Sequence, residues 1–130
     1  MGIRLKPASY GPIRILTGPG HPLRYQPHDG IAAAHPPSGA PALTMLASLG
    51  ACLAMSLEWC AKQCGVDLGA MTVELTGLKA ADMPSRFEQI EIVVEPENGP
   101  GALTEELLNQ AKQICTVSNS LNCQLSFTIV

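Results

Sequence analysis

The stretch Pro41–Gly65, PALTMLASLGACLAMSLEWCAKQCG, decides the fold, because it predicts one long helix with a clear beginning and end. Proline suits the first helical turn, where its missing N–H is not needed, and glycine suits the position just after the last turn. The first charged residue is Glu58, and leucine and methionine are spread around most of the helix circumference. Such a distribution is typical of a helix that is buried on nearly all sides.

A membrane span is the competing interpretation, since the apolar length before Glu58 approaches the roughly 20 residues that a bilayer requires. Four small or polar residues dilute its hydrophobicity: Thr44, Ser48, Gly50 and Ser56. The sequence has no second segment of this kind, and the flanking residues resemble those of a soluble domain. We therefore predict a core helix whose small residues allow another backbone to approach closely.

Composition limits the classes of function. The chain has 130 residues, a formal net charge of −3 and no cluster of lysine or arginine. This length corresponds to one domain, and the negative charge argues against nucleic acid or an anionic membrane as a partner. The N-terminal residues lack the apolar core of a signal peptide. Five cysteines, an odd number without an export signal, are interpreted as reduced thiols, so we expect a cytoplasmic protein.

Shorter elements surround the long helix. Before it, residues 12–17 and 21–26 predict a hairpin, and Pro12 and Pro22 restrict its strands to sheet edges or strand starts. After it, apolar and polar residues alternate over 71–76 and 90–95, which predicts two antiparallel strands. A second helix capped by Thr104, a short helical turn over 116–121 and a strand over 124–130 follow. The residues expected on the buried face of the second helix are Leu107, Leu108, Ala111, Ile114 and Cys115.

This order of elements predicts an α+β domain, with an antiparallel sheet packed on the long central helix and the second helix. One sheet covers only one side of a helix, so the other side of the long helix needs a second cover. A copy of the same chain, related by a twofold axis, is the simplest source of that cover. We therefore predict a homodimer, in which the N-terminal arms are exchanged or stay with their own chains.

Two cysteines lie on strongly patterned elements. Cys52 falls in the middle of the long helix, and Cys115 falls at the end of the second helix, just before a break whose free N–H groups favour a thiolate. The alternative is that both are small buried apolar residues. The remaining three, Cys60, Cys64 and Cys123, are interpreted as structural. The histidines fall in loop-like sequence, and we expect neither a metal site nor a cofactor.

The run PALTMLASLGACLAMSL from Pro41, followed by AKQICTVSNSL over 111–121, resembles the OsmC/Ohr family. In that family a proline-led helix carries one cysteine, a later helix ends in a Cys-Pro-Val/Tyr-Ser motif with the second, and the proteins are intertwined α+β dimers. The resemblance covers the chain downstream of about Pro37. It implies a single OsmC-like domain over 1–130, with an N-terminal β arm and loop over 1–36 and a helix-β-β-helix-β core over 37–130.

The resemblance implies a stress-protective peroxidase that reduces organic hydroperoxides. Cys52 would be the peroxidatic thiolate and Cys115 the resolving thiol, and an external dithiol would reduce the resulting disulfide. Peroxidase members carry a glutamate after the helix-initiating proline, paired with an upstream arginine that touches the reactive sulfur. This chain has Ala42 there, and Arg24 is the favoured candidate for the cation. Thr116 also replaces the usual proline after the second cysteine.

A second hypothesis belongs to another class of function. The dimer keeps the fold and an apolar cavity, but it binds a small hydrophobic ligand or carries sulfur without turning over peroxide. Ala42 and three methionines, Met45, Met55 and Met71, fit a cavity that is widened by loss of the charged pair. The reaction of the thiols with a hydroperoxide distinguishes the two hypotheses.

Overall fold

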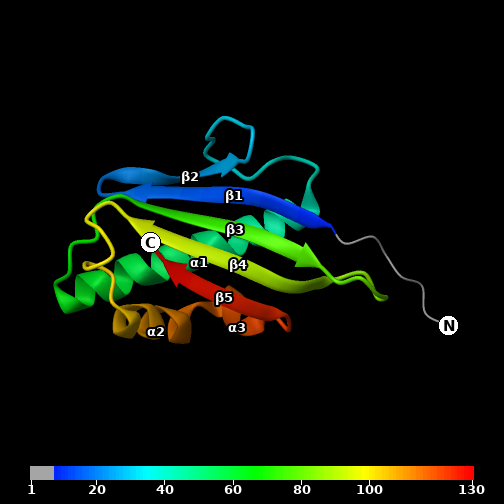
Figure 1. Ribbon diagram of the computed structural model, residues 1–130. Helices are drawn as coiled ribbons and strands as arrows, with labels where there is room; N and C mark the ends of the chain where they lie inside the picture. The colour runs from blue at the N-terminus through cyan, green and yellow to red at the C-terminus, as the bar shows by residue number, and fades with distance from the viewer. Residues whose placement is uncertain (1–7) are drawn as a thin grey trace.

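Five strands form a sheet in the order β2-β1-β3-β4-β5, and the helices lie along one face of it (Figure 1). The computed structural model describes residues 8–130. The strands are β1 (Ser9–Gly18), β2 (His21–Pro27), β3 (Met71–Lys79), β4 (Phe87–Pro96) and β5 (Gln124–Ile129), and the helices are α1 (Pro41–Cys64), α2 (Glu105–Ile114) and α3 (Thr116–Ser120). The predicted α+β class is confirmed.

The sheet is mixed, which corrects the prediction of an antiparallel sheet. Strands β1 to β4 pair antiparallel, as the alternating sequence patterns predict, but β5 runs parallel to β4. Between β4 and β5 the chain passes through α2 and α3 and so returns to the sheet in the same direction (Figure 1). Parallel neighbours require a crossover connection of this kind.

The N-terminal hairpin is built into the sheet of its own chain. Strand β1 lies between β2 and β3, so the expectation that Pro12 would confine its strand to an edge or a strand start is wrong. Pro12 is accommodated because the register between β1 and β3 shifts between Tyr10 and Ile13, and a bulge needs no ladder hydrogen bond from the proline nitrogen. Pro22 lies in β2, which is an edge strand.

Helix α1 begins and ends where the sequence predicts. Pro41 occupies its first turn, and Gly65 ends it with a left-handed backbone at φ 70°. Gly50 lies so close to the sheet that an added Cβ would collide with the side chains of Leu75 and Ile15. By length and composition α1 is able to span a membrane, yet its leucines pack in the core against the sheet. This packing is typical of the core helix of a globular domain.

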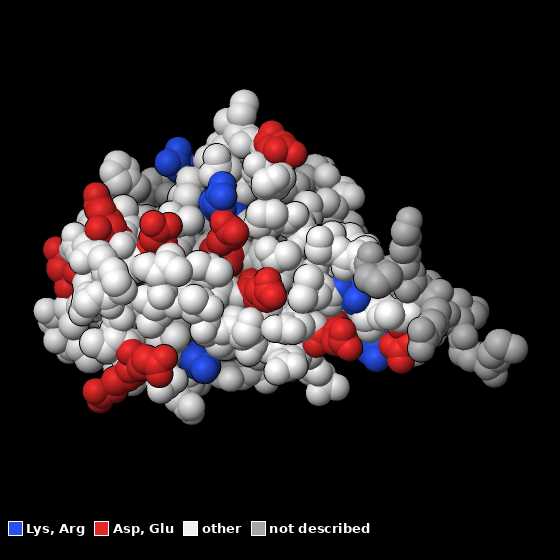
Figure 2. All heavy atoms as spheres, viewed as in Figure 1, with Lys and Arg blue, Asp and Glu red and all other residues white. Residues whose placement is uncertain are grey.

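The two faces of the sheet differ in character. The face toward α1 carries a set of fully buried apolar side chains: Ile13, Ile15, Val73, Leu75, Ile90, Ile92 and Val94. On the other face, Arg14 donates to the Glu74 carboxylate at 2.9 Å. Figure 2 shows acidic and basic side chains interspersed over the visible surface. Such a mixture differs from the basic face that nucleic-acid binding requires.

For helix α2, the structure confirms one prediction and corrects another. Thr104 caps its N-terminus, where the threonine side chain accepts a hydrogen bond from the N–H of Leu107 at 3.1 Å. Ile114 was expected on the buried face, but its side chain is 46% exposed. The helix ends at Ile114 and the backbone becomes extended at Cys115, so the chain changes direction there. The described part of the chain therefore leaves Ile114 partly uncovered.

Candidate functional site

One stripe of α1 is left open by the rest of the chain. Met55 and Trp59 on this stripe are 63% and 57% exposed. The prediction of a helix buried on nearly all sides is therefore wrong for a single chain, because the sheet, α2 and α3 cover only part of the circumference. Cys52 lies on the same stripe, about one turn before Met55, and its side chain is half-buried. The α1 stripe, as we call it, thus presents a thiol among exposed apolar side chains.

Cys115 lies at the junction of α2 and α3. It is fully buried, and its backbone is extended with φ −78° and ψ 94°, so it separates the two helices. Both helices contact α1. The junction is therefore held against the helix that carries Cys52.

The two thiols are neighbours in the fold. Burial raises the pKa of the Cys115 thiol, and the adjacent Cys52 side chain raises it further, while the hydroxyl and the N–H of Ser118 lower it. The expectation that backbone N–H groups after Cys115 favour a thiolate is therefore only half right, because burial outweighs them. The structure brings Cys52 and Cys115 together from separate elements of the chain.

Ser118 is the residue near this pair that the sequence analysis missed. Its side chain is 8% exposed, and its hydroxyl donates to the carbonyl oxygen of Cys115 at 3.1 Å. The signal in the sequence was its spacing, since a serine three residues after the start of a helical turn is placed to bond back to that start. Ser118 both fixes the turn after Cys115 and acts on the pKa of its thiol.

The other cysteines are arranged differently. Cys60 is buried, and this burial raises the pKa of its thiol, with a smaller increase from the nearby Cys64. Cys64 is exposed, and its thiol lies 3.6 Å from the side-chain oxygen of Gln110. Across residues 8–130, no group of three or more histidine, cysteine or carboxylate side chains is placed to hold a metal ion.

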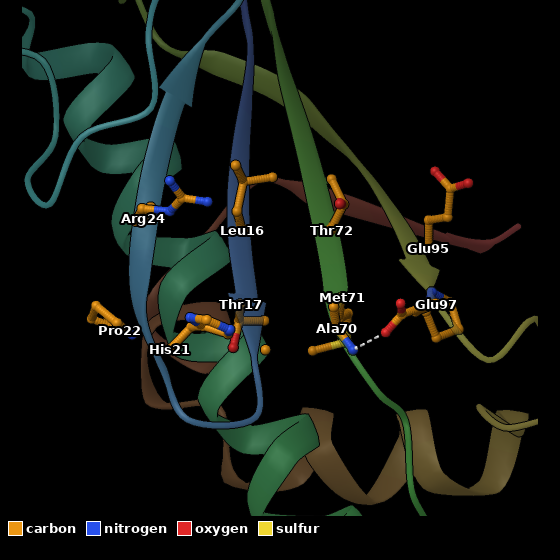
Figure 3. A pocket seen from close by; sticks show the side chains of 12 residues that line it. Leu16, Thr17, His21, Pro22, Arg24, Ala70, Met71, Thr72, Glu95 and Glu97 are labelled. Carbon is orange, nitrogen blue, oxygen red and sulfur yellow. Dashed lines mark hydrogen bonds between the residues drawn. The ribbon is translucent and has the colours of Figure 1, made fainter.

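Arg24, the predicted cation for the Cys52 thiolate, lies across the sheet from α1. Its partner on β1 is Leu16, which pairs in turn with Thr72 of β3 on the face turned away from the helix. Figure 3 shows Arg24, Leu16, Thr72 and Glu95 in a row across the strands, where they line a pocket of 520 Å³. Within one chain, therefore, the structure does not bring Arg24 to Cys52.

Comparison with known proteins identifies a family for most of the chain. Residues 37–130 match the family described as OsmC-like protein. The sequence matches no curated protein.

Solved structures share the fold at low sequence identity. The organic hydroperoxide resistance protein OhrB of Bacillus subtilis is 20% identical, with a TM-score of 0.59 over 88% of this chain and 96% of that one. The organic hydroperoxide resistance protein OsmC of Legionella pneumophila is 17% identical, with a TM-score of 0.58 over 89% of this chain and 95% of that one. An OsmC-like protein of unknown function from Vibrio cholerae is 13% identical, with a TM-score of 0.57 over 90% and 97%. At these identities the similarity shows the fold alone.

Proposed function

The chain belongs to the OsmC-like protein family, and from this premise we propose that it is a thiol-dependent peroxidase that reduces organic hydroperoxides through Cys52 and Cys115. The observation that carries the proposal is the neighbouring position of these thiols, which come from α1 and from the α2–α3 junction. Two of the structures compared above are named for hydroperoxide resistance, and the third has no known function. Family membership thus supports hydroperoxide reduction, and the reaction of the Cys52 and Cys115 thiols with a hydroperoxide tests it.

The exposure of the two thiols supports this order of the two steps. Cys52 is half-buried and Cys115 is fully buried, so a hydroperoxide reaches Cys52 first. The Cys52 thiolate attacks the terminal oxygen of the hydroperoxide, the O–O bond breaks, and the alcohol leaves after taking up a proton. Cys52 is then a sulfenic acid, whose sulfur is next to the Cys115 thiol.

The second step closes the disulfide. Cys115 attacks the Cys52 sulfur, an S–S bond forms, and the hydroxyl of the sulfenic acid leaves as water with the proton of Cys115. An external dithiol then reduces the disulfide and restores both thiols, while it is itself oxidised. All five cysteines are free thiols in the structure, and free thiols are typical of proteins in a reducing compartment. We therefore place the proposed reaction in the cytoplasm.

The proposal includes a homodimer. Met55 and Trp59 on the α1 stripe are exposed apolar side chains that a second copy is suited to cover, and Ile114 at the end of α2 is exposed as well. Such a cover would exclude water around Cys52 and give an organic hydroperoxide an apolar entrance. Arg24 lies on the face of the sheet that is turned away from α1 and does not reach Cys52 in its own chain, so its action on Cys52 would require the partner subunit to supply it.

Intact mass spectrometry tests the proposal. One equivalent of an organic hydroperoxide, added to the reduced protein, should lower the mass by two hydrogens and join Cys52 to Cys115 in the peptide map. An unchanged mass overturns the proposal of peroxidase activity.

The replacement Arg24→Met should slow the reaction with the hydroperoxide, and an unaltered rate removes Arg24 from the site.

A second candidate function is supported by a specific observation. Ala42 stands where peroxidase members of the family carry a glutamate, and together with Met45 it lines a cavity of 710 Å³. A dimer that binds a small hydrophobic ligand or carries sulfur, without peroxide turnover, fits this loss of charge. Unchanged mass after hydroperoxide, with a ligand retained through purification, favours this candidate.

A further inference from the structure

A cavity of 710 Å³ opens beside the first turns of α1. Four parts of the chain meet there: β1, the start of α1, the connection between β3 and β4 with the adjoining strand ends, and the residues that lead into β5. Its volume lies within the roughly 300–1,000 Å³ that is common for small-molecule sites. Neither Cys52 nor Cys115 lines it. The cavity is therefore a separate feature from the proposed redox pair.

Aromatic rings form part of the cavity wall. Tyr10 and Phe87 pack edge to face, with ring centroids 5.5 Å apart and an interplanar angle of 81°. The Phe87 ring occupies the space that a side chain at position 77 would fill, because a Cβ added to Gly77 would collide with it. Met45 lines the cavity from α1. This wall suits the apolar part of a small ligand.

The charged groups that line the cavity are Lys79, Arg86 and Glu88. Arg86 is already engaged, since its guanidinium lies 2.9 Å from the Asp82 carboxylate and 2.7 Å from the carbonyl oxygen of Pro84. Lys79 forms no ion pair with the described residues, which include all 11 aspartate and glutamate side chains of the chain. Lys79 is therefore the cation that is available to an anionic group in the cavity.

The cavity also contains a thiol. Cys123 lines it and is half-buried, so the residue can be reached from the cavity. The next residue, Gln124, pairs with Gln89 of β4, so the sheet fixes the position of Cys123. A lysine without an ion pair to the described residues, an aromatic wall and a thiol thus line one cavity.

We propose that this cavity is a binding and modification site for small thiols that carry carboxylates, which enter as their disulfides and are captured on Cys123. A carboxylate of the disulfide pairs with Lys79, and its apolar part lies against the aromatic wall. The Cys123 thiolate attacks one sulfur of the disulfide, so that a new S–S bond forms and the old one breaks. The other half leaves as a thiolate and takes up the proton that Cys123 has lost, and no further oxidant is required.

A pair of disulfides with opposite charge tests the site. The reduced full-length protein is treated in low salt with glutathione disulfide, which carries carboxylates, or with cystamine, which carries amines. Peptide mapping gives the rate of adduct formation at each cysteine. Cys64 is the internal reference, since it is exposed and lies outside the cavity. The ratio of the glutathione rate to the cystamine rate should be about threefold or more higher at Cys123 than at Cys64, and salt should reduce the difference.

Replacement of one lysine sharpens the result. Lys79→Gln should lower the ratio at Cys123 to the value at Cys64, whereas Lys112→Gln, on α2 outside the cavity, should leave it unchanged. Equal ratios at the two cysteines, no adduct at Cys123, or no effect of Lys79→Gln would each overturn the proposal. The measurement is read on Cys123, so failure of the peroxidase at Cys52 and Cys115 leaves it valid.

Discussion

Two pairs of cysteines in this protein come close in different ways. Cys60 and Cys64 are one turn apart on α1, so the helix alone places them side by side. Cys52 and Cys115 are distant in the chain, and only the packing of the α2–α3 junction on α1 makes them neighbours. In each pair one thiol is buried and its partner is more exposed.

The difference shows what a redox pair requires besides proximity. Within α1 the rigid backbone holds the Cβ atoms of Cys60 and Cys64 about 5–6 Å apart, which is longer than the roughly 3.5–4.5 Å of a disulfide. Cys115 instead occupies the extended residue between two helices, where a small change of backbone angles moves its sulfur. Cys52 lies on the α1 stripe and is half-buried, so in the proposed dimer a substrate reaches it through the apolar entrance. We therefore expect peroxide chemistry at the second pair and a structural role for the first.

The largest effect should come from removing the first sulfur. Cys52→Ser should slow oxidation by an organic hydroperoxide more than a hundredfold, because a hydroxyl does not replace the thiolate as nucleophile. Cys64→Ser, the matched change at an exposed thiol of the other pair, should retain the wild-type rate. Single-turnover consumption of cumene hydroperoxide measures both. A similar loss in the two variants would contradict the distinction between the pairs.

The second prediction concerns pH. Burial holds the pKa of Cys115 above the ordinary value for cysteine, about 8.5, so this thiol is protonated at neutral pH. Only its thiolate attacks the sulfenic acid, so closure of the disulfide should accelerate about tenfold per pH unit between pH 6 and 8. Stopped-flow measurement of the closure step, started from sulfenic acid formed at Cys52, gives the profile. A rate that is independent of pH would show that Cys115 is not the attacking group.

A smaller effect is expected at Ser118. Its hydroxyl and N–H lower the pKa of Cys115, so Ser118→Ala should raise that pKa further and slow disulfide closure about threefold at pH 7. The profile of closure rate against pH should move toward higher pH, by the amount that accounts for this threefold change in rate. Ser120→Ala is the control, because the Ser120 hydroxyl donates to the carbonyl oxygen of Thr116 at 2.7 Å. Equal changes in the two variants would mean that Ser118 acts only on the stability of the turn.

The smallest effect is expected from the buried member of the helical pair. Cys60→Ala should leave peroxide reduction unchanged and lower the free energy of unfolding by about 1 kcal/mol, since it removes a buried sulfur.

Its pH dependence adds a second readout. The pKa of Cys60 is raised in the fold, so the neutral thiol stabilises the protein fully below about pH 8.5, and this contribution is lost as pH rises through the folded-state pKa. Urea unfolding at pH 7 and pH 10 should therefore show a smaller loss of stability at high pH in Cys60→Ala than in the wild type. Identical losses would contradict this account.

Local stereochemistry let the sequence by itself determine much of the fold. Pro41 and Gly65 bound α1, Thr104 caps α2, and alternating residues define β3 and β4, because each of these signals acts within a few residues of the chain. The family also followed from two short runs around Cys52 and Cys115, since the residues beside a cysteine are a local pattern.

Tertiary structure decided what depends on contacts between distant segments. The crossover through α2 and α3 makes β5 parallel to β4, and the register of β2 on β1 places Arg24 on the face away from Cys52. Burial raises the pKa of Cys115 more than the donors of Ser118 lower it. No local sequence pattern indicates how much water a residue loses when the chain folds. Exposure, pairing order and proximity all depend on packing between distant parts of the chain, so only the three-dimensional structure determines them.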